Sequence, residues 1–119
     1  MKLSEAILLG SVMSTQTFGV TFSKDGSCAW GAALSSINIH EHSVYMHFAA
    51  IRNRWAWSFA GNYICPCCNT GLLPFSMIIH LNDGHRWTRP QIAAWVATIE
   101  PQEVAAAEPI TESQCVTRR

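Results

Sequence analysis

The fold of this chain is expected to depend on one stretch of sequence, Tyr63-Ile-Cys-Pro-Cys-Cys-Asn-Thr-Gly-Leu-Leu-Pro-Phe-Ser-Met-Ile-Ile-His-Leu-Asn-Asp-Gly-His85. Its thiols and imidazoles follow the spacing Cys65-x2-Cys68-x11-His80-x4-His85. Two thiolates and two imidazoles complete the tetrahedral ligand set of a zinc ion, and the short spacing within each pair lets the ligands converge. The residues therefore predict one Zn²⁺ ion in a closed, structural site.

The residues between the ligands suggest how they are brought together. Cys65 and Cys68 can meet at a tight turn, although Cys67 lies inside that turn and could replace Cys68 as the ligand. Pro74 suits the first turn of a helix, which would run to about residue 81 and carry His80 near its end. Asn-Asp-Gly at 82–84 is a stop signal, so a ligand at 85 would come from the turn just beyond. Asp83 could orient a histidine or simply end the helix, and the second role is favoured.

Residues 63–85 resemble the Cys2His2 zinc finger. Tyr63, Leu72 and Met77 match the aromatic and apolar positions of that pattern, although the gap between the two ligand pairs is one residue shorter than usual. The resemblance implies a hairpin and a helix around one zinc ion. DNA-reading fingers carry long polar side chains on that helix, whereas here residues 74–79 are largely apolar. The helix is therefore expected to face the protein interior rather than DNA.

A wider stretch, residues 3–99, is similar to small uncharacterised proteins of bacteria and phages. The similarity rests on Cys-Pro-x-Cys followed by His-Leu-Asn-Asp-x-His-x-Trp-Thr-Arg. It implies a bacterial or phage-encoded protein working in the cytoplasm, and it implies no established activity.

The composition limits the possible classes of protein. The chain has 119 residues, of which 49% are hydrophobic and 13% charged, so it can form a core and is not disordered as a whole. Eight basic and eight acidic residues leave no net charge, which argues against a protein that works mainly on nucleic-acid phosphates. An odd count of five cysteines favours a reducing compartment. No apolar run approaches the roughly 20 residues of a membrane span, and Glu5 interrupts the short apolar start, so neither a membrane partner nor an export signal is expected.

The first part of the chain predicts two closely packed helices. Residues 4–14 form an apolar periodic segment that Ser4 could cap, and a second helix should begin at Ser27 or Cys28 and end near residue 37. Gly10 and the alanine-rich second helix would allow a close approach, with Cys28 buried. Between them, residues 15–22 favour a short strand.

The middle of the chain is harder to interpret. Residues 37–48 alternate in a way that suits a strand or extended loop, with His40 and His42 on one face and His47 on the other. Trp55, Trp57 and Phe59 recur at every second position, so an extended segment would put them on one face. They form either core or an exposed platform for a partner. The candidate contacts to a protein or nucleic acid are Arg52, Arg54, Trp55, Trp57, Arg86 and Arg89.

The last element is the most clearly marked one. Thr88 and Gln91 form a capping-box pattern, and apolar residues follow at helical spacing to Ile99, before Pro101. The expected fold is α+β, mainly helical, in a single small domain. It has a helical and extended N-terminal part (1–60), a zinc-binding module with its following helix (61–100), and a weakly structured tail (101–119), in which Cys115 would be unligated.

The sequence contains no convincing catalytic set. The favoured hypothesis is a non-enzymatic protein with one structural zinc, which acts by binding another protein, plausibly as a phage or prophage accessory protein. A nucleic-acid-binding regulator that uses the basic and aromatic residues is the alternative. A zinc-dependent enzyme would need an open position on the metal, and a complete ligand set argues against it.

Overall fold

The computed structural model describes residues 1–40 and 43–102 and confirms a mainly helical α+β fold. Its helical elements are α1 (Leu3–Ser11), α2 (Ala29–Ser36), α3 (Val44–Arg54), the 3₁₀ turn η1 (Ala56–Phe59), α4 (Pro74–Ile79), the π-helical turn η2 (His80–Gly84) and α5 (Arg89–Ile99). The strands pair two by two: β1 (Thr15–Gln16) with β2 (Gly26–Ser27) in parallel, and β3 (Tyr63–Ile64) with β4 (Gly71–Leu72) antiparallel.

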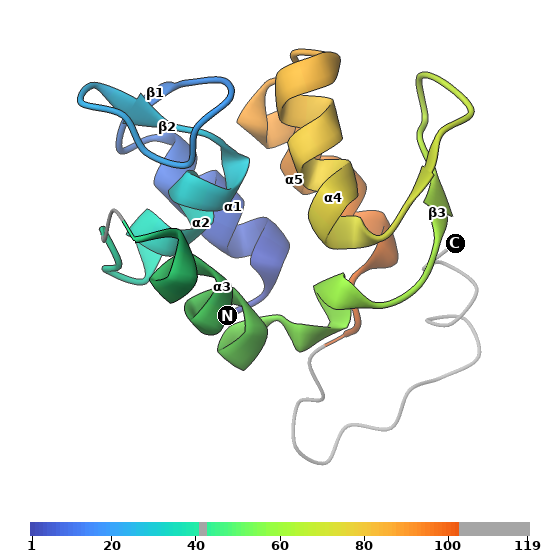
Figure 1. Cartoon of the computed structure of the whole chain (residues 1–119), viewed down its shortest axis with the longest axis horizontal. Coiled ribbons are helices and arrows are strands. Elements are labelled where there is room, and N and C mark those ends of the chain that lie inside the picture. Colours follow the sequence, from blue (N-terminus) through green and yellow to red (C-terminus); the bar gives the residue numbers. More distant parts are fainter. Residues whose placement is uncertain (41–42, 103–119) are drawn as a thin grey trace.

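Helices from both parts of the chain enclose one hydrophobic core. Figure 1 shows α1, α2 and α3 on one side and α4 with α5 on the other, while the β3 hairpin projects beyond α4. The core combines side chains from all five helices, among them Leu3, Leu34, Ile51, Met77 and Ile92. No helix in the described residues is long and apolar enough to cross a membrane.

The close contact between α1 and α2 depends on Gly10. A Cβ atom placed there would lie 1.7 Å from the carbonyl oxygen of Ala32, far inside any permitted contact. The predicted tight helical pair is therefore confirmed. Its first helix is shorter than expected, since it ends at Ser11.

Ser4 does not cap that helix, because the helix already begins at Leu3. Instead, the carboxylate of Glu100 accepts hydrogen bonds from both the backbone N–H (3.0 Å) and the hydroxyl of Ser4. A residue at the end of α5 thus supplies the anionic group that stabilises the N-terminus of α1.

Arg89 is a structural residue rather than a surface contact. Only 5% of its surface is exposed, and its guanidinium donates to the carbonyl oxygens of Ser11, Ser14 and Ser27 and to the Ser27 hydroxyl. Burial lowers the pKa of the Arg89 guanidinium. The side chain joins the start of α5 to the end of α1 and to β2.

Three further predictions need correction. Residues 44–48 are helical, because α3 begins at Val44 with Ser43 as its N-cap. Trp55, Trp57 and Phe59 do not share a strand face, since Trp55 closes α3 and the other two lie in η1. Within residues 15–22, only the first two form a strand. His42 and the segment 103–119, including Cys115, lie outside the described residues.

Replacement of Gly10 by alanine should destabilise the fold. The new methyl group would collide with backbone, which cannot move aside as a flexible side chain can, so the free energy of unfolding should fall by more than about 2 kcal/mol. Leu9→Ala is the control, because Leu9 is exposed on the same helix. Chemical denaturation measures both. Equal stability of the two variants would show that the helices separate at no cost.

Arg89→Met should also destabilise the protein, because it leaves buried carbonyl groups without donors. The expected loss is about 2–4 kcal/mol of unfolding free energy. Arg54→Met, an identical change at an exposed position, should alter stability by less than about 0.5 kcal/mol. A neutral effect of Arg89→Met would mean that water satisfies those carbonyls equally well.

Candidate metal centre

The first two ligands come from the β3–β4 hairpin. Its tip is closed by a hydrogen bond from the Cys65 N–H to the Thr70 carbonyl oxygen at 2.9 Å. The N–H of Cys67 points back at the sulfur of Cys65 at 3.4 Å, which draws the chain into a tight turn. This turn brings Cys68 round to the side on which Cys65 lies, as the spacing predicts.

The other two ligands come from the π-helical turn that follows α4. Five residues apart on an α-helix correspond to a rotation of about 140°, which would turn the two histidines away from each other. The wider turn η2 changes this relation, because the N–H of His85 donates to the carbonyl oxygen of His80 at 3.2 Å, an i+5 bond. The two imidazole rings then stand edge to face, with centroids 4.6 Å apart.

The four predicted ligands meet at one point. Their donor atoms in Cys65, Cys68, His80 and His85 all lie within 4.8 Å of one another. Nε2 of His80 is 3.1 Å from Nε2 of His85 and 3.4 Å from Sγ of Cys68. A tetrahedral zinc ion would require separations of about 3.3 Å between nitrogens and about 3.6 Å between sulfur and nitrogen. The donor set therefore fits one zinc-sized ion, while Cys67 is exposed and outside the cluster.

The electrostatics of the cluster favour a bound cation. The Thr70 hydroxyl and the two histidines stabilise the Cys68 thiolate and lower the pKa of that thiol to about 5. Cys68 is therefore ready to bind metal near neutral pH without first losing a proton. Cys65 is buried, whereas the other three ligands are partly exposed, so the ion would lie near the surface with one side toward the core.

Asn82 holds the histidine turn in place. Its side chain is almost completely buried, and its Oδ1 accepts from the Ala29 N–H (3.1 Å) and from Nε2 of Gln16 (2.9 Å). Its Nδ2 donates to the Thr17 carbonyl oxygen (3.0 Å) and to Oδ1 of Asp83 (2.7 Å). The turn carrying the ligands is thereby attached to α2 and to the segment around β1.

The sequence analysis missed this role, because Asn82, Asp83 and Gly84 together form a turn signal. Among the described residues Asp83 forms no hydrogen bond to a histidine: its Oδ1 accepts from the Gly19 N–H at 2.9 Å and from Asn82. The only clue in the sequence was an amide directly after a buried leucine on an apolar helix. Its four partners come from segments more than fifty residues away or from its neighbour, and no local pattern reveals them.

The proposed surface residues separate into two groups. Trp55 and Arg89 are buried, so their side chains do not belong to an exposed contact surface. Arg52, Arg54 and Arg86 are exposed, and Trp57 is half-buried against the core. Arg52 lies over the ring of Phe59 at 5.3 Å and Arg86 over Phe18 at 4.1 Å.

Comparison with protein-family models, with curated proteins and with solved structures finds no match to this chain. The geometry of the cluster is consistent with a zinc-finger-like module, and the wider resemblance to bacterial and phage proteins stays a prediction.

Substitution of Cys65 by serine should release the metal and destabilise the fold, since binding of a structural zinc is coupled to folding. Cys67→Ser is the matched control, and it should keep about one zinc per chain because its sulfur lies outside the cluster. Metal content by mass spectrometry and thermal unfolding measure both. Loss of zinc from Cys67→Ser together with its retention in Cys68→Ser would assign the ligand to Cys67.

Proposed function

We propose that this chain is a non-enzymatic protein whose single zinc ion is structural and which acts by binding another protein. The observation that carries the proposal is the complete ligand set, in which four protein donor atoms converge within 4.8 Å. A zinc ion with four protein ligands has no position left for water or substrate, and its remaining contribution is to stabilise the fold.

Large apolar side chains on the surface support the protein-binding part. The N-terminal half of α3 exposes Val44, Tyr45, Met46 and Phe48, and the end of α1 with the two residues that follow it exposes Leu8, Leu9, Val12 and Met13. Large exposed apolar patches are typical of interaction sites.

The alternative functions have less support. A nucleic-acid-binding regulator retains Arg52, Arg54 and Arg86 as exposed cations, but the fourth predicted arginine is enclosed in the protein. A zinc enzyme would need an open position on the metal, and four converging protein donor atoms argue against one. Burial raises the pKa of the Cys28 thiol, which keeps it protonated and a poor nucleophile. An origin as a phage or prophage accessory protein in the bacterial cytoplasm rests on the sequence resemblance.

A cobalt-substituted protein tests the closed site. Co²⁺ bound by two sulfurs and two nitrogens should give a tetrahedral absorption spectrum that azide leaves unchanged, because no position is free. The same protein should not slow the migration of DNA or RNA in a native gel at low ionic strength. A spectrum that shifts with azide favours the enzyme, and retardation that disappears with added salt favours the nucleic-acid regulator.

A further inference from the structure

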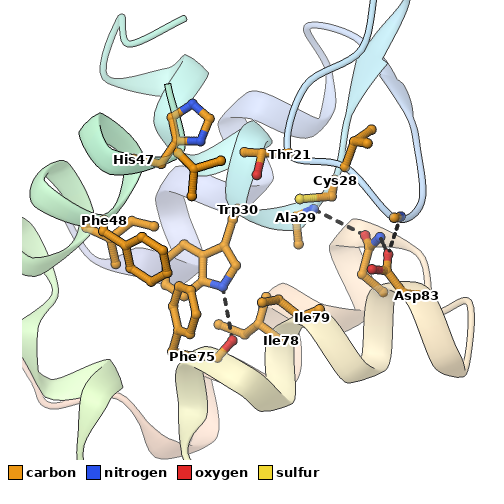
Figure 2. Close-up of a pocket in the computed structure, with 15 residues that line it drawn as sticks. Thr21, Cys28, Ala29, Trp30, His47, Phe48, Phe75, Ile78, Ile79 and Asp83 are labelled. Atoms are coloured by element: carbon orange, nitrogen blue, oxygen red, sulfur yellow. Dashed lines mark hydrogen bonds between the residues drawn. The ribbon is translucent and has the colours of Figure 1, made fainter. Parts of the chain in front are cut away.

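A concave site lies away from the candidate metal centre. It is a cavity of about 210 Å³ lined by α3, α4, the start of α2 and the segment around Thr21 (Figure 2). None of the four candidate metal ligands lines it.

The interior of the cavity is aromatic and has few free polar atoms. Phe75 packs against three other rings, with centroid distances of 5.3 Å to Trp30, 5.3 Å to Phe48 and 4.8 Å to Phe59. The one indole donor there is already used, since Nε1 of Trp30 donates to the Phe75 carbonyl oxygen at 3.1 Å. Such a lining favours an apolar or aromatic group over water.

The mouth of the cavity is apolar as well. Val20, Val44, Phe48 and Ile79 all line it and are all exposed, although they come from three separate segments. An apolar cavity with an apolar exposed edge has the form of a protein-binding site in which one anchor side chain enters and the surrounding surface excludes water.

A carboxylate stands at one end of this site. Oδ1 of Asp83 is held by the Gly19 N–H and by Asn82, which fixes the orientation of the group. The side chain is partly exposed, and it forms no ion pair within residues 1–40 and 43–102. Its charge is thus available to a cation that arrives with the anchor.

The size of the cavity selects among occupants. An apolar cavity of about 150 Å³ accommodates benzene, whereas pockets for drug-sized ligands or cofactors measure about 300–1,000 Å³. A volume of about 210 Å³ lies between these values. It suits one aromatic side chain better than a cofactor.

We propose that this cavity receives an aromatic side chain of a partner protein, with a lysine or arginine next to that side chain facing Asp83. The inference rests on the proposed protein-binding function and specifies its site and the chemistry of its partner. The aromatic ring would stack among Phe48, Phe75 and Trp30, and the basic residue would give the complex its register.

The experiment uses the full zinc-loaded chain and a displayed library of random 12-residue peptides. The selected peptides should contain an aromatic residue adjacent to lysine or arginine. Nuclear Overhauser contacts should connect the peptide ring with Phe48 and Phe75. Peptides without that pair, or peptides whose contacts lie on α1, would overturn the assignment of the pocket, and so would a failure to select any peptide.

Three variants sharpen the test. Phe48→Ala should weaken peptide binding by about tenfold, while Tyr45→Ala, the same kind of change one turn earlier at an exposed residue outside the cavity, should alter it by less than about twofold. Asp83→Asn keeps the oxygen that accepts from Gly19 and removes the charge. It should weaken the binding of a peptide that contains the lysine but not of the same peptide with alanine in its place. An equal loss of affinity for both peptides would contradict the proposed ion pair with Asp83.

This outcome can be separated from the proposed function. If the selected peptides bind to another face, the cavity is not the binding site, but the proposal that the protein binds another protein still stands. A cobalt spectrum that changes with azide would contradict the proposed function, regardless of which peptides are selected.

Discussion

The carboxamide of Asn82 is the interaction on which the arrangement of this protein depends. It is buried and makes four hydrogen bonds, so all of its donors and acceptors are satisfied inside the protein. A buried amide is favourable only when its partners are correctly placed. The network therefore joins α2, the β1 segment and the histidine turn to one another.

Other buried polar groups act in the same way at the opposite ends of the helices. Glu100 binds the N-terminus of α1, and Arg89 binds the carbonyl groups at its C-terminal end. Helix α5 thus holds both ends of α1 with groups of opposite charge, each at the end of the helix dipole that it complements. In a chain with only 13% charged residues, two of them serve to fix one helix.

The parts of the fold that the sequence revealed are those encoded by local spacing. The cluster of Cys65, Cys68, His80 and His85 could be predicted because the spacing within each pair is set by a single turn, and α5 because Thr88 and Gln91 form a capping box. The aromatic residues at 55–59 led to a wrong prediction of one shared face on an extended segment. Their alternation over five positions arises by chance where a helix ends and a 3₁₀ turn begins. The burial of Arg89 could not be foreseen, because its acceptors are serine backbone and hydroxyl groups more than sixty residues away.

The π-helical turn η2 has a further consequence. Four of its five residues have four different roles in succession: His80 belongs to the candidate metal cluster, Leu81 to the core, Asn82 to the hydrogen-bond network and Asp83 to the cavity between α3 and α4. If the metal orders this turn, it also orders the carboxylate at the cavity. The two sites would then be thermodynamically linked, and any factor by which zinc strengthens binding in the cavity must equal the factor by which the occupied cavity strengthens the binding of zinc.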